Sequence, residues 1–225
     1  TFHQTFTKKV VINYTTDIDH DKTETKANGS YKNSVHLAWE NDGSNGSGEA
    51  NGSATFTPDP YTKANGFKGA AYNLQTKTID WTIGVNYNKA TLKDAVIEDI
   101  ITGNQNFDPA SIRVFRMTLT GGWNGYTQGE ELTRASSPAA GSYAVESFTG
   151  LNGEPAFRIK LGDITGAYLI TYRTDLNDQL VEKTYTNMAI VKSDQPSFEL
   201  TTTVSPAYGG EYTKKQAVQD SSNPR

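Results

Sequence analysis

The chain has 225 residues, of which 35% are hydrophobic and 20% are charged, and its formal net charge is −4. This balance leaves no basic field to hold phosphates, so we expect no nucleic-acid partner. No apolar run approaches the ~20 residues of a membrane helix, which argues against membrane insertion, and without cysteine no disulfide can stabilise the fold.

Short β-strands are predicted along most of the chain, because runs rich in Val, Ile, Thr and aromatic residues alternate with turn signals. In chain order the runs are KKVVINYTT, SVHLAWE, KTIDWTIGVNYN, AVIEDII, SIRVFRMTL, SYAVESF, AFRIKLG, AYLITYRTDL, TYTNMAIV and SFELTTTV. NDGSNGSGEANGS and TGGWNGYTQGE are among the turns, and only YNKATLKDA suggests a helical turn. The pattern predicts an all-β fold, an Ig-like β-sandwich of antiparallel strands.

Two stretches of the chain show the same features in the same order. Residues 10–39 and residues 167–192 each give an apolar strand ending in Tyr-x-Thr-Asp, then a polar turn, then a strand with Tyr-x-Asn. A Thr-rich strand and then an aromatic residue with a lysine follow each of them, as Phe67-Lys68 and as Tyr212 before Lys214. The spacing predicts a tandem-repeat array with a period of roughly 150 residues.

This array divides the chain into three predicted parts. Residues 1–55 are the C-terminal strands of a preceding Ig-like repeat, residues 56–195 a complete repeat, and residues 196–225 the opening strand of a following one. A chance likeness of two β-hairpins is the alternative, since Tyr, Thr and Asn are common in β proteins. Strand donation from the tail of one molecule to the head of the next is a further alternative, ranked below the fragment interpretation.

Asn187 is out of place in the strand TYTNMAIV. Alternation puts it in line with Tyr185 and Val191 on a row that is expected to face the core, where an amide without partners costs about 1–3 kcal/mol. Lys68 in GFKGAAYNL and Asp99 in AVIEDII also fall in or beside strands. The first and last strands of a sandwich can pair as neighbours, so we expect Lys68 and Asn187 to meet in the core.

The run from TIDWTIG to SIRVF, with FK before it and YTNMAIV after it, resembles the collagen-binding-type (CnaA-like) Ig domains of Gram-positive surface adhesins and pilins. The resemblance covers about residues 60–192. It implies a spontaneous intramolecular isopeptide bond, in which the lysine of the family falls on Lys68, its acid on Asp99 and its asparagine on Asn187. The neighbouring lysines that could take the place of Lys68 are Lys63 and Lys77.

The chemistry of such a bond suits these residue types. A buried lysine loses its proton and becomes a nucleophile, and a buried aspartic acid stays protonated and can relay protons to the departing ammonia. No cofactor is needed. In the other predicted repeats, Asn33 and Lys214 take the corresponding crosslink positions.

We therefore expect a structural and adhesive segment of a bacterial cell-surface protein, an adhesin stalk or pilus-like fibre, and not an enzyme. The alternative is a carbohydrate- or matrix-binding sandwich with ligand loops within residues 120–142. Expected partners are neighbouring repeats or subunits of the same protein, and a host matrix protein or glycan. The expected location is extracellular, at the cell surface, anchored to the cell wall through parts outside this chain.

Two weaker signals complete the sequence. Asp17, Asp19 and Asp21 form D-x-D-x-D, like the start of a calcium loop, but a solvated acidic turn is favoured because the rest of the motif is missing. Trp123 and Tyr126 lie among glycines, either as a ligand platform or packed back on the sandwich. The histidines are scattered, and no metal site or catalytic triad is predicted.

Overall fold

The computed structural model describes residues 10–16, 29–40, 46–103, 105–176 and 184–206, and every structural statement below refers to these residues. The chain divides after Pro58 into two compact units. Within the described ranges, no helix has the length and apolar character needed to cross a membrane.

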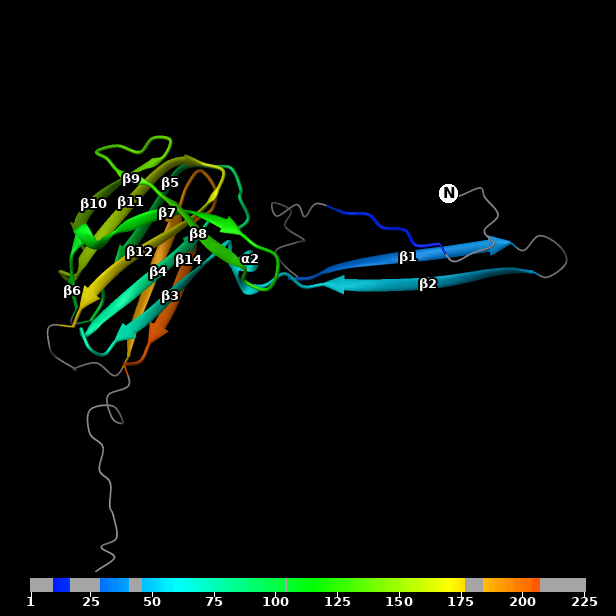
Figure 1. The fold of residues 1–225 in the computed structure, drawn as a ribbon, viewed down its shortest axis with the longest axis horizontal. Helices are drawn as coiled ribbons and strands as arrows, with labels where there is room; N and C mark the ends of the chain where they lie inside the picture. The colour runs from blue at the N-terminus through cyan, green and yellow to red at the C-terminus, as the bar shows by residue number, and fades with distance from the viewer. Residues whose placement is uncertain (1–9, 17–28, 41–45, 104, 177–183, 207–225) are drawn as a thin grey trace, which may run out of the picture. The chain divides into compact units, whose positions relative to one another are not determined.

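The first unit contains an antiparallel hairpin of β1 (Tyr31–Glu40) and β2 (Ser47–Phe56) (Figure 1). Alternation places Val35, Leu37 and Trp39 on one face of β1, where they are 62%, 57% and 42% exposed. Small residues of β2 lie opposite them, and the ring of Trp39 lies so close over Gly48 that a Cβ there would come within 2.3 Å of it. This fit explains why the predicted turn NDGSNGSGEANGS is partly strand.

The second unit contains the other elements. They are α2 (Pro60–Ala64), β3 (Gly66–Asn73), β4 (Thr78–Val85), β5 (Leu92–Ile100), β6 (Asn106–Phe107), the 3-10 helix η1 (Pro109–Ser111), β7 (Arg113–Leu119), β8 (Tyr126–Glu131), β9 (Thr133–Arg134), β10 (Ser142–Thr149), β11 (Pro155–Ile164), β12 (Ala167–Asp175), β13 (Tyr185–Lys192) and β14 (Phe198–Val204).

These strands form two sheets that face each other (Figure 1). One has the order β14-β13-β5-β11-β10-β9, and the other has the order β3-β4-β12-β7-β8 with β6 beside β12. All pairs are antiparallel except the short β9–β10 pair. The predicted sandwich of antiparallel strands is confirmed, whereas the tandem array and its division into three parts stay predictions.

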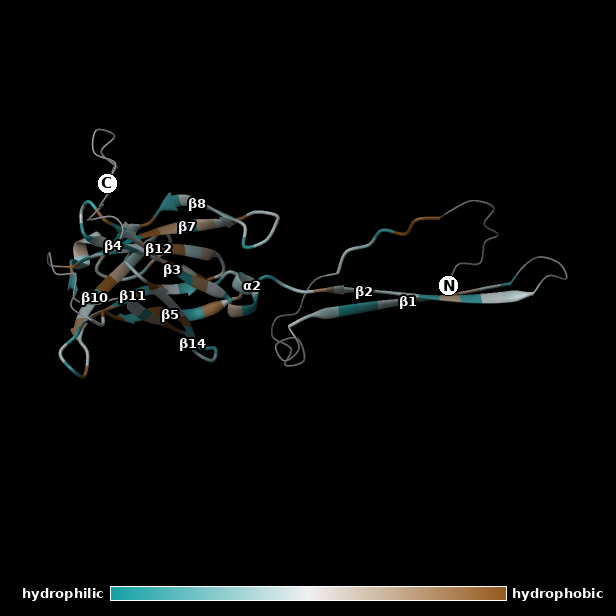
Figure 2. Ribbon diagram, turned by 90° about the horizontal axis from the view of Figure 1, so that it is seen from below, coloured by the Kyte–Doolittle hydropathy of each residue, from teal (hydrophilic) through white to brown (hydrophobic). Residues whose placement is uncertain are grey.

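The main core fills the space between the two sheets. Its largest fully buried side chains include Trp81, Phe157, Ile83, Ile97 and Ile170. Figure 2 shows the alternation of apolar and polar residues along the strands that produces it. A second cluster lies on the opposite face of the β3-β4-β12-β7-β8 sheet, because successive side chains change face, and it consists of Phe67, Tyr87, Phe115, Met117, Ala167 and Leu169.

Two local predictions were wrong. YNKATLKDA forms a turn instead of a helical turn: the Asn86 side chain bonds both the N–H and the C=O of Ala90, and β5 begins at Leu92. The strand predicted for KKVVINYTT is absent from its described part, residues 10–16, which have no regular secondary structure. The helix α2, which was not predicted, starts where the Asp59 carboxylate accepts from Thr62 N at 2.8 Å and Pro60 begins the first turn.

Candidate functional site

Four polar side chains meet in the main core, two from each sheet. Lys68 on β3 and Tyr172 on β12 come from one sheet, and Asp99 on β5 and Asn187 on β13 come from the other. The expectation that β3 and β13 pair as neighbours was wrong. β13 pairs with β5 and β14, so Lys68 and Asn187 approach each other across the sandwich.

Strand register places the acid beside the amide. Asp99 lies opposite Ala189 in the β5–β13 pair, and Asn187 is two residues from Ala189, on the same face of β13. Its neighbours in sequence, Thr186 and Met188, are exposed. The predicted alternation of β13 is therefore confirmed, and it directs Asn187 into the core next to Asp99.

The contacts among the four groups are short. Lys68 Nζ donates to Asp99 Oδ2 at 2.5 Å and to the Tyr172 hydroxyl at 3.1 Å. The Tyr172 hydroxyl donates to Asp99 Oδ2 at 2.8 Å and accepts from Asn187 Nδ2 at 3.2 Å. One phenol oxygen thus contacts the amine, the carboxyl and the amide.

Burial dominates the electrostatics of this cluster. The side chains of Lys68 and Asp99 are both fully buried. Burial lowers the pKa of the Lys68 amine and raises the pKa of the Asp99 carboxyl, and the attraction between the two groups only partly opposes this. The amine also lies 5.6 Å from the centre of the Trp81 ring and 5.3 Å from that of Tyr172. Both groups are therefore shifted towards their neutral forms.

Two oxygens of the cluster have no hydrogen-bond partner, namely Asp99 Oδ1 and Asn187 Oδ1. The buried Asn86 shows the ordinary structural use of an amide, because its oxygen and its nitrogen are both bonded to backbone groups. An ionised carboxylate can only accept hydrogen bonds, and so can an amide oxygen. A proton on Asp99 would supply the donor that this pair of oxygens lacks.

The other lysines considered from the sequence lie elsewhere. Lys63 is exposed in the last turn of α2, and Lys77 is half-buried in the turn between β3 and β4. Asn33 is exposed, and its amide nitrogen donates to the Tyr14 hydroxyl. Lys214 and the aspartates Asp17, Asp19 and Asp21 lie outside the described residues. Within the parts of the chain that the structure describes, no group of His, Cys, Asp and Glu could hold a metal ion.

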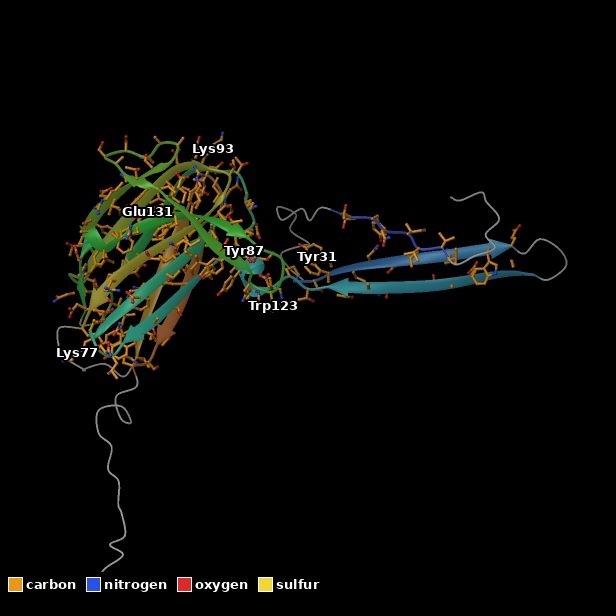
Figure 3. All side chains as sticks on the ribbon, in the orientation of Figure 1. Tyr31, Lys77, Tyr87, Lys93, Trp123 and Glu131 are labelled. Carbon is orange, nitrogen blue, oxygen red and sulfur yellow. The ribbon has the colours of Figure 1, made fainter. Side chains whose placement is uncertain are left out.

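Trp123 and Tyr126 have separate environments. Tyr126 packs back on the sandwich, with its ring centre 5.0 Å from that of Phe67. Trp123 is 68% exposed in the β7–β8 loop, at the end of the second unit that carries α2 (Figure 3). The loop around it is held in place, because Asp59 Oδ2 accepts from Asn124 N at 3.2 Å and the Tyr87 hydroxyl donates to Gly125 O at 2.9 Å.

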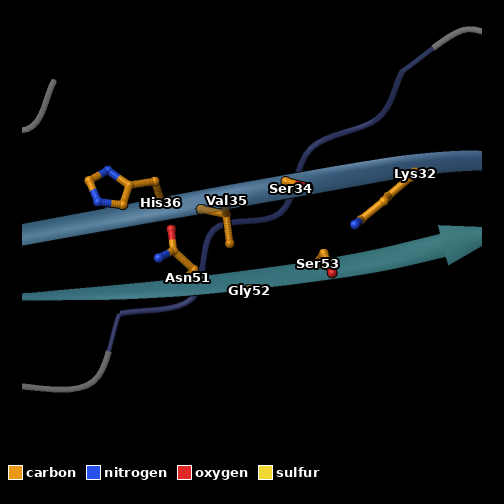
Figure 4. A pocket seen from close by; sticks show the side chains of 7 residues that line it. All are labelled: Lys32, Ser34, Val35, His36, Asn51, Gly52 and Ser53. Carbon is orange, nitrogen blue, oxygen red and sulfur yellow. The ribbon is translucent and has the colours of Figure 1, made fainter.

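A shallow hollow lies on the hairpin of the first unit. Lys32, Ser34, Val35, His36, Asn51, Gly52 and Ser53 line it (Figure 4). These seven residues on an open two-stranded ribbon do not enclose a ligand, and no buried charged group lies among them. We therefore place no site there.

Tyr172 is the member of the cluster that sequence reasoning missed. The signal for it was present in the repeated Tyr-x-Thr-Asp, which begins at Tyr172 and at Tyr14. Aromatic residues are common in strands, and nothing in the alternation distinguishes a tyrosine that packs from one whose hydroxyl meets a buried amine.

A family model described as a collagen binding domain matches residues 63–199, which is more than half of the chain. The chain belongs to the collagen binding domain family. This confirms the family resemblance read from the sequence. The family is one of adhesin domains and not of enzymes, in agreement with the prediction that this collagen binding domain is not an enzyme.

Several solved structures are similar to this collagen binding domain. The collagen-binding domain of a Staphylococcus aureus adhesin has 16% identity over 63% of this chain and 97% of its own, with a TM-score of 0.43. The collagen binding subdomain of the Enterococcus faecalis surface protein ACE has 14% identity over 62% and 93%, with a TM-score of 0.45. That of the Erysipelothrix rhusiopathiae surface protein RspB has 15% identity over 78% and 56%, with a TM-score of 0.45.

Membership of the family rests on the family model alone. None of the curated protein sequences is a significant match to the chain. The named relatives are adhesins or surface proteins of bacteria.

Proposed function

We propose that this chain is a collagen-binding segment of a bacterial surface adhesin, whose central sandwich is stabilised by an isopeptide bond between Lys68 and Asn187 that forms without an enzyme. The observation that carries the proposal is the cluster of a buried amine, a buried carboxyl and a buried amide inside a sandwich of the collagen binding domain family. Asp99 is the acid that relays protons during bond formation.

Burial supports the reaction in two ways. A neutral Lys68 amine is a nucleophile, and a protonated Asp99 can polarise the Asn187 carbonyl by donating to its oxygen. Groups held together by two packed sheets react as if at a very high concentration, which is worth about 7–11 kcal/mol of the barrier. The amine adds to Asn187 Cγ, the bond from Cγ to Nδ2 breaks, and ammonia leaves. The product replaces the buried Lys68 amine by a neutral amide that joins the two sheets, and the Asp99 carboxyl remains.

Mass spectrometry of the intact chain tests the crosslink. We expect the chain to be lighter than its sequence mass by one ammonia. Asp99→Ala should fold and keep the full mass, because it removes the proton relay but neither bonded partner. Glu98→Gln is the matched control, since Glu98 points out of the core to Arg158 and Lys192, and it should crosslink as the wild type does. A wild-type chain of full mass would refute the crosslink.

Family membership supports binding to collagen, and Trp123 is the residue we assign to the contact. Collagen chains are extended polyproline II helices, and aromatic side chains on a rigid surface bind such segments. Trp123 is exposed on a loop that Asp59 and Tyr87 hold, so little ordering is needed on binding.

Solid-phase binding to immobilised triple-helical collagen tests this assignment. The wild-type chain should bind, and Trp123→Ala should bind at least several-fold more weakly. Leu151→Ala is the matched control, because Leu151 is another exposed apolar side chain in a loop of the same unit, and it should bind as the wild type does. Failure of the wild-type chain to bind collagen would contradict the collagen-binding part of the proposal and leave the crosslink to its own test.

The domain organisation is part of the same proposal. Residues 1–55 supply the closing strands of a preceding repeat, residues 56–195 form a complete one and residues 196–225 open the next, within a stalk or pilus-like array anchored to the cell wall through other parts of the protein. The support is the register that two hairpins share: in β1–β2 and in β13–β14 alike, the tyrosine of Tyr-x-Asn pairs with the last residue of the following strand. Neighbouring repeats would then be partners of each unit, beside the host matrix.

A further inference from the structure

The Tyr172 hydroxyl is placed like a reacting group of the crosslink. Its oxygen lies 3.1 Å from Lys68 Nζ, 2.8 Å from Asp99 Oδ2 and 3.2 Å from Asn187 Nδ2. Lys68 Nζ is the attacking atom of the proposed reaction, and Asn187 Nδ2 is the leaving atom. Tyr172 therefore contacts the atom that must lose a proton and the atom that must gain one.

Packing fixes this hydroxyl. The Tyr172 ring is stacked on Trp81 with centres 6.2 Å apart, and the edge-on rings of Phe157 and Phe107 lie at 5.0 Å and 5.8 Å. Trp81 is itself held by a hydrogen bond from Nε1 to Thr174 Oγ1 at 2.9 Å. The phenol oxygen thus keeps its position between the two sheets while bonds form and break.

The charge state of Tyr172 suits the passage of a proton. Burial, reinforced by the neighbouring Asp99, raises the pKa of the Tyr172 hydroxyl well above its ordinary value. The hydroxyl is therefore protonated before the reaction and is not a phenolate base. A hydroxyl that accepts one proton while it gives up another needs no net change of charge in the core.

The same tyrosine–asparagine contact recurs in the other unit of the chain. Asn33 Nδ2 donates to the Tyr14 hydroxyl, as Asn187 Nδ2 donates to the Tyr172 hydroxyl. Each tyrosine begins a Tyr-x-Thr-Asp segment, and each asparagine ends a Tyr-x-Asn segment. The tyrosine–asparagine contact therefore accompanies the repeated segments in both units.

We propose that Tyr172 is a catalytic residue of the crosslink, which carries the proton from Asp99 to the departing amide nitrogen of Asn187. The inference rests on the crosslinking reaction proposed above. Lys68 first gives a proton to the Asp99 carboxylate, and its neutral amine adds to Asn187 Cγ. Asp99 then returns that proton to the Tyr172 oxygen as the Tyr172 hydroxyl proton moves to Asn187 Nδ2. The Cγ–Nδ2 bond breaks, ammonia leaves, and the surplus proton of the new amide nitrogen passes to Asp99.

This route uses the contacts of Asp99 with Lys68 and with Tyr172, and the contact of Asn187 with Tyr172. The Asp99 proton can be shared with Asn187 Oδ1, which has no other donor, while the amide is attacked. Asn187 Nδ2 contacts the Tyr172 hydroxyl, so the leaving nitrogen has a proton donor at 3.2 Å. Without the hydroxyl, Asp99 would have to serve the attacking amine, the carbonyl oxygen and the leaving nitrogen alone.

The test is the rate of crosslinking in Tyr172→Phe, which removes the hydroxyl and keeps the ring. Protein that is recovered in an unfolded, uncrosslinked form is refolded. Intact-mass measurements at successive times then give the fraction of molecules that have crosslinked. Pulse proteolysis before each sample restricts the count to folded molecules, so a loss of stability cannot be mistaken for slow chemistry. We expect a fall of about 10²-fold or more, as for the loss of a general acid–base group.

Tyr143→Phe is the matched control. It removes another buried tyrosine hydroxyl of the same sandwich, which donates to Ile112 O at 3.0 Å and has no contact with the cluster, and it should crosslink at the wild-type rate. If Tyr172→Phe crosslinks as fast as the wild type, or if Tyr143→Phe is slowed equally, the catalytic assignment is wrong while the crosslink itself stands. A wild-type chain that never loses ammonia would instead overturn the crosslink on which the inference rests.

Discussion

Two hairpins of the chain have the same register and a different environment. In both, the asparagine of Tyr-x-Asn lies in the third residue pair from the end of the ladder, and its side chain is on the apolar face. The corresponding cross-strand pairs are Tyr185–Val204 and Asn187–Thr202 in β13–β14, and Tyr31–Phe56 and Asn33–Ala54 in β1–β2. In β13–β14 this face is covered by the opposite sheet, and in β1–β2 it is exposed.

The difference shows that the sequence of a strand determines the face on which a side chain lies, whereas the groups around that side chain depend on the rest of the fold. Alternation alone decides that Asn187 and Asn33 belong to an apolar row. Only the opposite sheet surrounds one of them with a buried amine and a buried hydroxyl, those of Lys68 and Tyr172, and under the proposed chemistry this makes Asn187 the reacting amide. Asn187 is 1% exposed beside a buried carboxyl, whereas Asn33 is exposed with a tyrosine hydroxyl as its described partner.

Replacing each asparagine by alanine is the sharpest way to test this contrast. Asn187→Ala should restore the full sequence mass and lower the free energy of unfolding by about 4–5 kcal/mol, the value expected when a crosslink that closes a loop of this length is lost. Asn33→Ala should change neither the mass nor the main unfolding transition by a measurable amount. Intact-mass measurement and urea unfolding followed by fluorescence give both quantities. If Asn187→Ala were still lighter than its sequence mass by one ammonia while Asn33→Ala had its full sequence mass, Asn33 and not Asn187 would be the crosslinked residue.

Two glycines that face an apolar residue across a ladder give the next largest difference. Gly84 lies opposite Phe67 in β3–β4, and Gly52 lies opposite Val35 in β1–β2. A Cβ at Gly84 would come within 2.1 Å of the Phe67 ring, which cannot move freely because it is stacked on Tyr61 at 4.1 Å. Gly84→Ala should therefore lower the free energy of unfolding by about 1–3 kcal/mol.

Gly52→Ala is the control for this substitution. Its Cβ would lie 3.2 Å from Val35, a side chain that is mostly exposed and can shift. The free energy of unfolding should change by no more than about 0.5 kcal/mol, since surface substitutions rarely do more. Equal costs at the two glycines would mean that the hairpin is covered in solution.

The smallest expected effect concerns ion pairs. Glu98 on β5 accepts from Arg158 Nε at 2.5 Å and from Lys192, whereas Glu49 on β2 pairs with His36 at 3.5 Å in an exposed position. Partial burial alone would raise the pKa of Glu98, but the two cations together lower it. Glu98→Gln should cost about 0.5–1 kcal/mol at neutral pH, and Glu49→Gln about zero.

The pH dependence of Glu98→Gln follows from the direction of this shift. A carboxyl whose pKa is lower in the folded state stabilises the fold above its unfolded pKa, and the contribution is lost as the pH falls through the folded pKa. The variant and the wild type should therefore differ at neutral pH and converge in acid, in urea titrations at a series of pH values. A difference that grows towards acid would show that Glu98 does not stabilise the fold through its charge.

The parts of the site that could be predicted from the sequence are those visible in the alternation of apolar and polar residues along a strand and in the residue types that interrupt it. Asn187 is conspicuous because an amide interrupts an apolar row, and Lys68 and Asp99 are conspicuous as charges within strands. The pairing of β3 with β13 was wrongly expected, because the sequence of a strand does not state which sheet it joins. The β1–β2 hairpin was only half predicted, because Gly and Ser in β2 look like turn residues until the Trp39 ring is seen lying over Gly48.

The order of the four clustered residues along the chain has a consequence for biosynthesis. Lys68, Asp99 and Tyr172 lie on β3, β5 and β12, and all three are synthesised before β13 brings Asn187. A growing chain thus holds the nucleophile, the acid and the proton carrier but no acyl group for them to attack. Under the proposed chemistry, the bond forms only in a molecule that has completed and docked its closing strand. Loss of ammonia would then record that folding of this domain has finished.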